Sequence, residues 1–266
     1  MRKKRKPFDD KRDKIVFLGT GGGRIVVFSQ VRASGGLWFQ LDGKIFVIDP
    51  GPGALVKAAN MGISIRKLKA IFISHRHLDH CADINSIIVA MTEGARRKKG
   101  IVFAPPDAID EDSVILEYCK NTVENIIRLK QGGKYKIDDI SLYTPLKFIH
   151  PPQTFGVIIE SERYTISYIT DTLWFDELPQ IFQGDVVIMN TVFKEPRQGF
   201  YHLCIHDVEK YLSVYKPKIL ILNHFGMTLL RAKPWEWAER ISKQFNTKVL
   251  AAWDNMVFDL DKEVGQ

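Results

Sequence analysis

The sequence predicts an α/β fold with two β-sheets and outer helices. Runs typical of strands recur along the whole chain, and amphipathic helical patterns fall between them. The order is strands first, then alternating helices and strands, then a second similar set. This order favours two layered sheets covered by helices over a sandwich without helices. The 266 residues and the hydrophobic fraction of 45% suffice for one large core.

The expected strands are rich in β-branched and aromatic residues. They cover residues 14–18, 25–28, 37–41, 44–48, 70–74, 101–104, 156–160, 165–170, 186–191, 219–223, 249–253 and 256–260. The expected helices cover residues 54–61, 82–92, 110–129, 207–214 and 234–245. Pro234 suits the first position of a helix, and Gly62 suits the position where a helix ends.

Composition sets the expected compartment and the domain boundaries. The net charge is +7, and five of the positive charges lie in the first six residues. We therefore expect residues 1–13 to form a basic, flexible tail and residues 14–266 to form a single domain. An arm that contacts phosphate backbones is the alternative interpretation of this tail. Cys81, Cys119 and Cys204 are too few and too widely spaced for a disulfide framework, which favours a reducing cytoplasm.

The distribution of apolar residues predicts neither a membrane-spanning helix nor a secretory signal. No apolar run approaches the roughly 20 residues that a membrane-spanning helix needs. The basic N-terminus is not followed by an apolar segment, so a secretory signal is not expected.

Four apolar runs end on a histidine or an aspartate. The runs at 44–48, 70–74, 165–170 and 219–223 are followed by Asp49, His75, Asp171 and His224. Sites in α/β folds gather where strands end, because rigid strands hold the following loop residues in place. We therefore expect these four residues to belong to one site.

The second of these endings carries the strongest chemical signal. His75, His77, Asp79 and His80 lie within six residues and include three of the seven histidines of the chain. Imidazole and carboxylate are ligands for a borderline metal such as zinc. The spacing of His75 and His77 lets both imidazoles converge on one ion, while Asp79 and His80 follow on the next turn toward a second ion.

The segment from His75 to His80 resembles the HxHxDH signature of the metallo-β-lactamase superfamily. The resemblance extends from Val16 to Leu260, and the later motifs can be matched in order. It implies an αββα four-layer sandwich of two mixed β-sheets with outer helices. It also implies two divalent metal ions, with zinc as the usual metal and manganese or iron as alternatives.

The resemblance also implies the ligand set. His75, His77 and His150 would hold one ion, and Asp79, His80 and His224 would hold the other. Asp171 and a bridging hydroxide would span both ions. Asp49 resembles the acidic residue that orients a metal ligand, which agrees with its expected role as an acceptor for a ligand N–H group. A plain turn residue before Pro50 is its alternative.

Three further features are interpreted through the same resemblance or remain open. His202 looks like the histidine that binds or protonates the scissile phosphate in nuclease and phosphodiesterase branches, and a surface loop histidine is its alternative. Cys81 and Cys204 are expected to be small buried hydrophobic residues. The segment from Leu18 to Arg24 resembles the LGTG loop of phosphodiesterase members, and either an anion-binding nest or a tight hairpin without a ligand fits it.

The branch with the greatest similarity contains ribonuclease Z and related phosphodiesterases. Only 20 residues separate His150 from Asp171, which leaves no room for the arm that grips tRNA in ribonuclease Z. Asp83 stands where the family usually has glycine, a change expected to alter only a helix start.

These features predict a dinuclear metal hydrolase of the phosphodiesterase type. The metal-bridging hydroxide would attack phosphorus, Asp79 would accept or position the proton, and His202 would assist the leaving oxygen. The expected substrate is RNA, a nucleotide or a small phosphodiester.

Two other functions and one assembly remain open. One alternative is hydrolysis of a carboxylic bond in a lactone, thioester or β-lactam. The other is a metal-stabilised RNA-binding module that uses the basic tail. The chain offers no sign of its oligomeric state, so a homodimer is left open.

Overall fold

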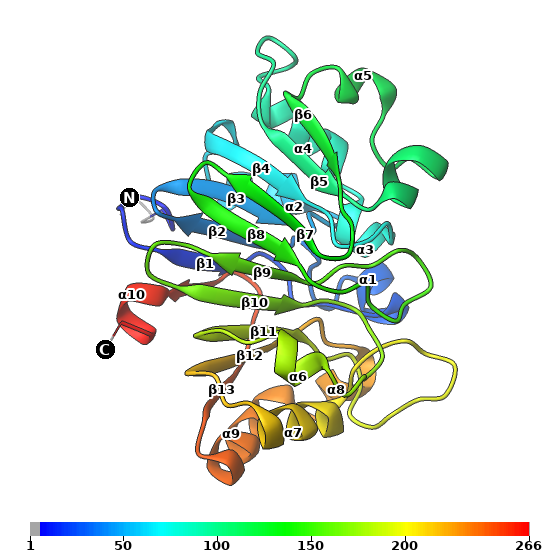
Figure 1. Ribbon diagram of the computed structural model, residues 1–266, viewed down its shortest axis with the longest axis vertical. Helices are drawn as coiled ribbons and strands as arrows, with labels where there is room; N and C mark the ends of the chain where they lie inside the picture. Colours follow the sequence, from blue (N-terminus) through cyan, green and yellow to red (C-terminus); the bar gives the residue numbers. More distant parts are fainter. Residues whose placement is uncertain (1–5, 266) are drawn as a thin grey trace. The chain divides into compact units, whose positions relative to one another are not determined.

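The computed structural model describes residues 6–265 (Figure 1). The chain divides into two compact units. Unit 1 takes residues up to 19, residues 33–128 and the residues from 254 onward, and unit 2 takes residues 20–32 and 129–253. Each unit contains one seven-stranded sheet. Each unit is therefore assembled from segments that are distant in the sequence.

The sheet of unit 1 has the strand order β14-β1-β2-β3-β4-β5-β6. The pairs from β14 to β3 are antiparallel, and the pairs from β3 to β6 are parallel. The strands are β1 (Lys14–Phe17), β2 (Leu37–Leu41), β3 (Lys44–Ile48), β4 (Leu68–Phe72), β5 (Ile101–Ala104), β6 (Asn125–Arg128) and β14 (Met256–Asp259). The parallel half matters for function, because it places the carboxyl ends of β3 and β4 side by side.

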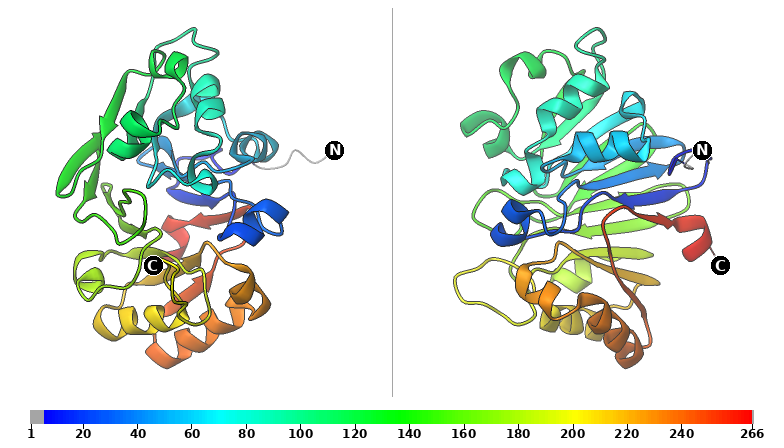
Figure 2. Two further views of the ribbon diagram at one scale, coloured as in Figure 1. Left: turned by 90° about the vertical axis from the view of Figure 1, so that its right-hand side faces the viewer. Right: turned by 180° about the vertical axis from the view of Figure 1, so that it is seen from behind.

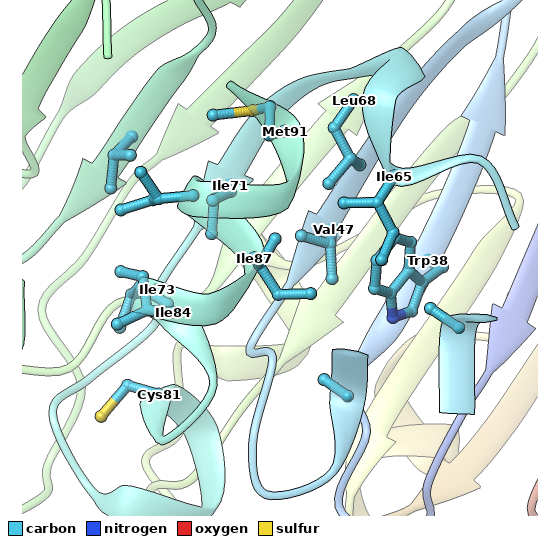
Figure 3. Packing of buried hydrophobic residues seen from close by; sticks show 14 of the residues in the cluster. Trp38, Val47, Ile65, Leu68, Ile71, Ile73, Cys81, Ile84, Ile87 and Met91 are labelled. Atoms are coloured by element: carbon cyan, nitrogen blue, oxygen red, sulfur yellow. The ribbon is translucent and has the colours of Figure 1, made fainter. Parts of the chain in front are cut away.

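The helices of unit 1 are mostly short. They are α2 (Ala54–Met61), the 3₁₀ turn η1 (Ile65–Lys67), α3 (Leu78–Cys81), α4 (Ile84–Met91), the π-type turn η2 (Asp107–Glu111), α5 (Glu117–Lys120) and α10 (Leu260–Glu263). Helix α4 packs its buried side chains on the sheet, with Ile84, Ile87 and Met91 against Val47 and Ile71 (Figure 3). Full burial of such a side chain contributes about 1.5–3 kcal/mol. This packing holds the segment directly after α3 firmly on β4.

The sheet of unit 2 has the order β13-β12-β11-β10-β9-β8-β7. The pairs from β13 to β10 are parallel, and those from β10 to β7 are antiparallel. The strands are β7 (Gly133–Ile137), β8 (Ile140–Thr144), β9 (Val157–Glu160), β10 (Thr165–Ile169), β11 (Val186–Asn190), β12 (Ile219–Asn223) and β13 (Lys248–Ala251). Both units thus combine an antiparallel half with a parallel half.

The helices of unit 2 are α1 (Arg24–Ser29), α6 (Leu178–Ile181), α7 (Ile205–Val214), α8 (Met227–Arg231) and α9 (Pro234–Phe245). Helices α7 and α9 lie next to each other along the parallel half of the sheet (Figures 1 and 2). Their apolar side chains share one core with β11 and β12, including Tyr211, Ile241, Met189 and Leu222. This core fixes the ends of the strands that carry the candidate residues of unit 2.

The predicted α/β class with two sheets and helices is confirmed. The strands at 37–41, 44–48, 101–104 and 219–223 and the helices at 54–61 and 234–245 have the predicted bounds. The predicted strand at 25–28 is wrong, because α1 covers it and buries only Val26. Strands β7 and β8 were not predicted.

The predicted helix at 110–129 is also wrong. This segment forms η2, α5 and β6 instead. Strand β6 pairs in parallel with β5, and Arg128 at its end pairs with Asp110 at 2.6 Å. Tertiary pairing therefore overrides the local helical pattern here.

Two findings bear on the ends of the chain and on membranes. Within the described residues, no helix is both long and apolar enough to cross a membrane. Residues 1–5 of the predicted basic tail lie outside the described residues. In residues 6–13, two residues contact the neighbouring strands. The Asp10 carboxylate accepts from Lys14 Nζ at 2.7 Å, and the carbonyls of Asp10 and Arg12 accept from the Gln40 side chain.

Candidate metal centre

The residues from His75 to His80 follow strand β4 of unit 1 directly. Strand β4 ends at Phe72, and the short helix α3 begins at Leu78. His75 is fully buried and His77 is exposed in the connecting loop, while Asp79 and His80 lie in the first turn of α3. The segment thus presents two imidazoles from the loop before α3, and one carboxylate and one imidazole from α3 itself.

The ligand atoms of this segment lie close together. His75 Nε2 is 3.0 Å from His77 Nδ1. His80 Nε2 is 3.8 Å from Asp79 Oδ2. Zinc–nitrogen and zinc–oxygen bonds of about 2 Å place two ligand atoms of one ion about 3.3 Å apart. Both pairs therefore fit the donor chemistry and the spacing that a divalent ion needs.

The buried carboxylate of Asp49 supports two of these histidines. Its oxygens accept hydrogen bonds from Ser74 N at 2.7 Å, Ser74 Oγ at 2.7 Å and His80 Nδ1 at 2.9 Å. Ser74 Oγ lies 3.0 Å from His75 Nδ1. Since Ser74 Oγ donates its proton to Asp49, it accepts from His75 Nδ1–H. The ring proton of both His75 and His80 is then on Nδ1, and Nε2 carries the lone pair that a metal ligand needs.

The turn that carries Asp49 has a special backbone. Asp49 has a φ of 54°, in the left-handed region, and its amide donates to Phe72 O at 2.9 Å. A Cβ atom on Gly51 would lie 1.9 Å from the carbonyl oxygen of Asp79. The turn after β3 therefore touches the ligand segment itself, and only glycine permits that approach.

Unit 2 gathers a second group of candidate residues. Asp171 follows β10 and His224 follows β12, so they extend from parallel strands that flank β11. Asp171 Oδ1 lies 3.4 Å from His224 Nδ1, and Asp171 Oδ2 lies 3.4 Å from His202 Nδ1. Asn190 at the end of β11 donates to Asp171 Oδ1 at 2.9 Å. The carboxylate of Asp171 is therefore the centre of this group.

His150 reaches the same group from the loop after β8. Its ring lies 5.3 Å from the ring of His202, centroid to centroid. His150 Nδ1 donates to Tyr201 O at 2.9 Å, which leaves Nε2 available to a metal. The structure therefore brings His150, Asp171, His202 and His224 together within unit 2.

The glycine-rich segment packs against His224 rather than forming the hairpin considered above. Gly22 N donates to Phe225 O at 3.0 Å, and Phe225 N donates to Thr20 O at 2.7 Å. A Cβ atom on Gly22 would lie 2.2 Å from His224 Nδ1. His224 itself has a φ of 60°, a conformation that costs of order 1 kcal/mol and persists where surrounding contacts enforce it.

The cysteines behave as buried hydrophobic residues, as predicted. All three are free and buried. Burial, followed by the nearby carboxylates Asp49 and Asp79, raises the pKa of Cys81 to about 12. Burial also raises the pKa of Cys204 to about 12, with the carboxylate of Asp207 as the next cause. Both thiols are therefore protonated near neutral pH.

Other residues of the sequence prediction also have clear places. Asp83 precedes α4, and its carboxylate accepts from Leu55 N at 2.9 Å at the start of α2. His206 is an exposed residue of the first turn of α7 and pairs with Glu209.

Ser74, Asn190 and Tyr201 were not predicted to support the site. Ser74 and Asn190 stand at strand ends, so the argument from strand endings applied to them as well. The Tyr201 carbonyl carries no signal in the sequence, because any residue there supplies the same backbone oxygen.

Comparison with known proteins places these residues in a family. A family model described as a β-lactamase superfamily domain matches residues 44–225, a range that includes every candidate ligand. An uncharacterized protein of Methanocaldococcus jannaschii, MJ1374, is 30% identical over 248 residues, which cover 91% of this chain and 92% of the relative. Ribonuclease Z of Methanococcus aeolicus is 28% identical over 154 residues, which cover 57% of this chain and 40% of that enzyme.

Solved structures share the fold. The metallo-β-lactamase fold protein YhfI from Bacillus subtilis has a TM-score of 0.79 at 20% identity, covering 93% of this chain and 99% of YhfI. A diphosphatase of the PhnP family has a TM-score of 0.70 at 19% identity, covering 93% and 98%. Human tRNase Z, short form, has a TM-score of 0.67 at 16% identity, covering 92% and 98%.

At these identities the solved structures show the fold alone, and they confirm the predicted fold class. The family model covers more than half of the chain, and the archaeal relative matches over nearly the full length of both proteins. The chain therefore belongs to the metallo-β-lactamase superfamily of hydrolases, and its curated relatives resemble it on the ribonuclease Z side of that superfamily.

Proposed function

We propose that this chain is a dinuclear-metal phosphodiesterase. In this proposal His75, His77 and His150 hold one ion, Asp79, His80 and His224 hold the other, and Asp171 serves both. The observation that carries it is the support of the donors, since Asp49 and Ser74 place the ring proton of both His75 and His80 on Nδ1, so Nε2 carries the lone pair that a metal ligand needs. A site that is only structural is closed with four ligands, whereas this set has seven.

Zinc is the proposed metal, because imidazole and carboxylate donors without a thiolate suit it. Manganese and iron are the alternatives, since the same donors accept them as well. The metals would supply charge neutralisation and a lowered pKa for a water molecule in the site. The residues of the chain supply the rest of the chemistry.

The proposed catalytic residues are Asp79 and His202. The Asp79 side chain is about one-fifth exposed, so its carboxylate is accessible for holding or accepting a proton. His202 is partly buried and lies beside the Asp171 carboxylate, which orients the imidazole. We propose that His202 donates a proton to the leaving oxygen of the phosphodiester. The phosphodiester substrate is further supported by the sequence relatives, which include ribonuclease Z enzymes.

The test is hydrolysis of bis-p-nitrophenyl phosphate by the purified protein with zinc or manganese. We expect turnover that falls at least about 100-fold in H75A and H202A, with the metal content measured in each variant. H206A is the matched control, because His206 is an exposed histidine in the same unit as His202 and pairs with Glu209 on the surface of α7. Absence of activity with every metal, or faster turnover of a lactone panel, would contradict the proposal.

A further inference from the structure

The loop that joins β11 to α7 combines aromatic and basic side chains. We call residues 193–201 the aromatic–basic loop; it leads directly into His202 and extends away from the strands of its own sheet (yellow in Figures 1 and 2). Its base is fixed, because Ile205 N donates to Phe193 O at 3.1 Å and Phe193 forms a bridge with Cys204. The loop is therefore anchored at both ends.

Within this loop a guanidinium group lies over two phenylalanine rings. Arg197 is 5.4 Å from the centroid of Phe193 and 5.0 Å from the centroid of Phe200. The two rings meet edge to face at 5.6 Å. Phe193 is buried, whereas Phe200 is 48% exposed. These contacts thus hold the exposed Phe200 ring and the Arg197 guanidinium in a defined position. Exposing an aromatic ring to water normally costs free energy.

The loop also contacts the candidate residues of unit 2. The ring of Phe193 lies 5.9 Å from that of His202. The ring of Tyr201, which is 42% exposed, lies 6.5 Å from that of His150. A molecule bound on the exposed part of the loop would therefore lie next to His202, the proposed proton donor, and His150, a proposed metal ligand.

The charges of the loop favour an anionic aromatic ligand. Lys194 and Arg197 supply two cations, and Glu195 is the acidic residue that lies 3.6 Å from Lys194. A different exposed apolar group in the same unit, Ile25, Phe28 and Val31 around α1, shows no aromatic–cation contact among the described residues. Aromatic rings beside cations are the usual platform for bases of single-stranded nucleic acid.

We propose that the aromatic–basic loop binds a nucleobase next to the scissile phosphodiester. Phe200 would stack on the base, and Arg197 would contact a neighbouring phosphate while holding Phe200 in place. This inference rests on the proposed function and narrows its substrate class to phosphodiesters that carry a nucleobase. Phe200 and Arg197 would then determine specificity rather than the chemical step.

The first test compares two substrates with the same leaving group. These are the p-nitrophenyl ester of thymidine 5′-phosphate and ethyl p-nitrophenyl phosphate, which lacks the base. Stacking on an aromatic residue corresponds to roughly a 5- to 100-fold change in affinity. We expect the preference in kcat/KM for the thymidine ester to fall by that factor in F200A, mostly through KM, and to return in F200W.

F28A is the matched control, because Phe28 is a still more exposed phenylalanine of the same unit. It should keep the substrate preference of the unmodified protein. Equal losses on both substrates in F200A, or an unchanged preference, would overturn the proposal.

A second test does not depend on hydrolysis. The metal-free protein is titrated into a 2-aminopurine trinucleotide, and the fluorescence change gives the affinity. We expect binding that weakens about 5- to 100-fold in F200A and is unchanged in F28A. Equal binding by F200A would overturn the stacking proposal. Normal binding without hydrolysis of any ester would instead contradict the proposed phosphodiesterase activity and leave the loop proposal supported.

Discussion

The two units supply their candidate ligands in different ways. In unit 1, four ligands come from six consecutive residues, and one carboxylate, Asp49, supports two of them. In unit 2, the candidate residues come from separate loops after β8, β10 and β12, and their contacts are shared among Asp171, Asn190 and the Tyr201 carbonyl. The ligands of unit 1 thus depend on one supporting carboxylate, and we call them the concentrated group. The ligands of unit 2 depend on several separate contacts, and we call them the distributed group.

This difference has an energetic consequence. Removal of a concentrated support should disturb several ligands at once, whereas removal of one distributed contact should disturb a single ligand. In both units supporting residues stand at the carboxyl ends of parallel strands, β3 and β4 in unit 1 and β10 to β12 in unit 2, whereas His150 follows β8 of the antiparallel half.

The largest effect is expected for Asp49→Ala. The substitution leaves Ser74 N and the Ser74 hydroxyl without their buried acceptor and removes the support of His80, so the free energy of unfolding should fall by about 3 kcal/mol. Metal affinity, measured by competition with a chelator, should weaken about 10- to 100-fold. D83A is the control, because Asp83 is a helix-start carboxylate of the same unit. If D49A and D83A bound metal equally well, Asp49 would not be a shared support for the ligands of unit 1.

Gly22→Ala should have the next largest effect, confined to one ligand of the distributed group. The new methyl carbon would lie 2.2 Å from His224 Nδ1 and 2.5 Å from His224 O, so His224 must move. We expect one of two metal equivalents to bind about 10-fold more weakly. G132A is the control for a destabilising glycine substitution without a steric clash, because its Cβ atom meets nothing within 4 Å and its cost comes only from the φ of 71°. If G22A bound both equivalents normally, His224 would not be a ligand.

Asn190→Ala should have a smaller effect. It removes one hydrogen bond of 2.9 Å to Asp171 and two longer contacts, one to the Tyr168 hydroxyl and one from Asn223 Nδ2, while His202 and His224 still flank Asp171. A single hydrogen bond of this kind corresponds to about a 3- to 10-fold change in metal affinity. Isothermal titration with zinc measures it. A loss as large as that of D49A would show that unit 2 also depends on one support.

The same difference explains how much of the site could be predicted from the sequence. The contiguous ligands from His75 to His80 are visible as a spacing pattern, and the support by Asp49 follows from a strand ending. The dispersed ligands Asp171 and His224 were found through strand endings as well. The Tyr201 carbonyl could not be predicted, because a backbone acceptor leaves no mark on residue identity.

The errors in the fold have a related cause. The segment 25–28 is apolar enough for a strand, yet α1 lies on the surface and buries only Val26. The segment 110–129 has a helical pattern, but residues 125–128 form β6 by pairing in parallel with β5. In both cases the outcome depends on which neighbour is available in space, which local periodicity does not encode.

The smallest effect at neutral pH is expected for Cys204→Ser, which tests whether the thiol beside the His202 loop belongs to the site. Burial raises the pKa of this thiol from 9.0 to about 12, so its contribution to stability is full below pH 9 and is lost as the pH rises toward 12. The free energy of unfolding of the unmodified protein should fall by about 1.4 kcal/mol per pH unit more than that of C204S across this interval. Serine also caps the start of α7, so the two proteins should differ by less than about 1 kcal/mol at pH 7. Urea unfolding at several pH values measures this difference in stability. A loss of bound metal in C204S would instead show that the Cys204 thiol supports the candidate ligands of unit 2.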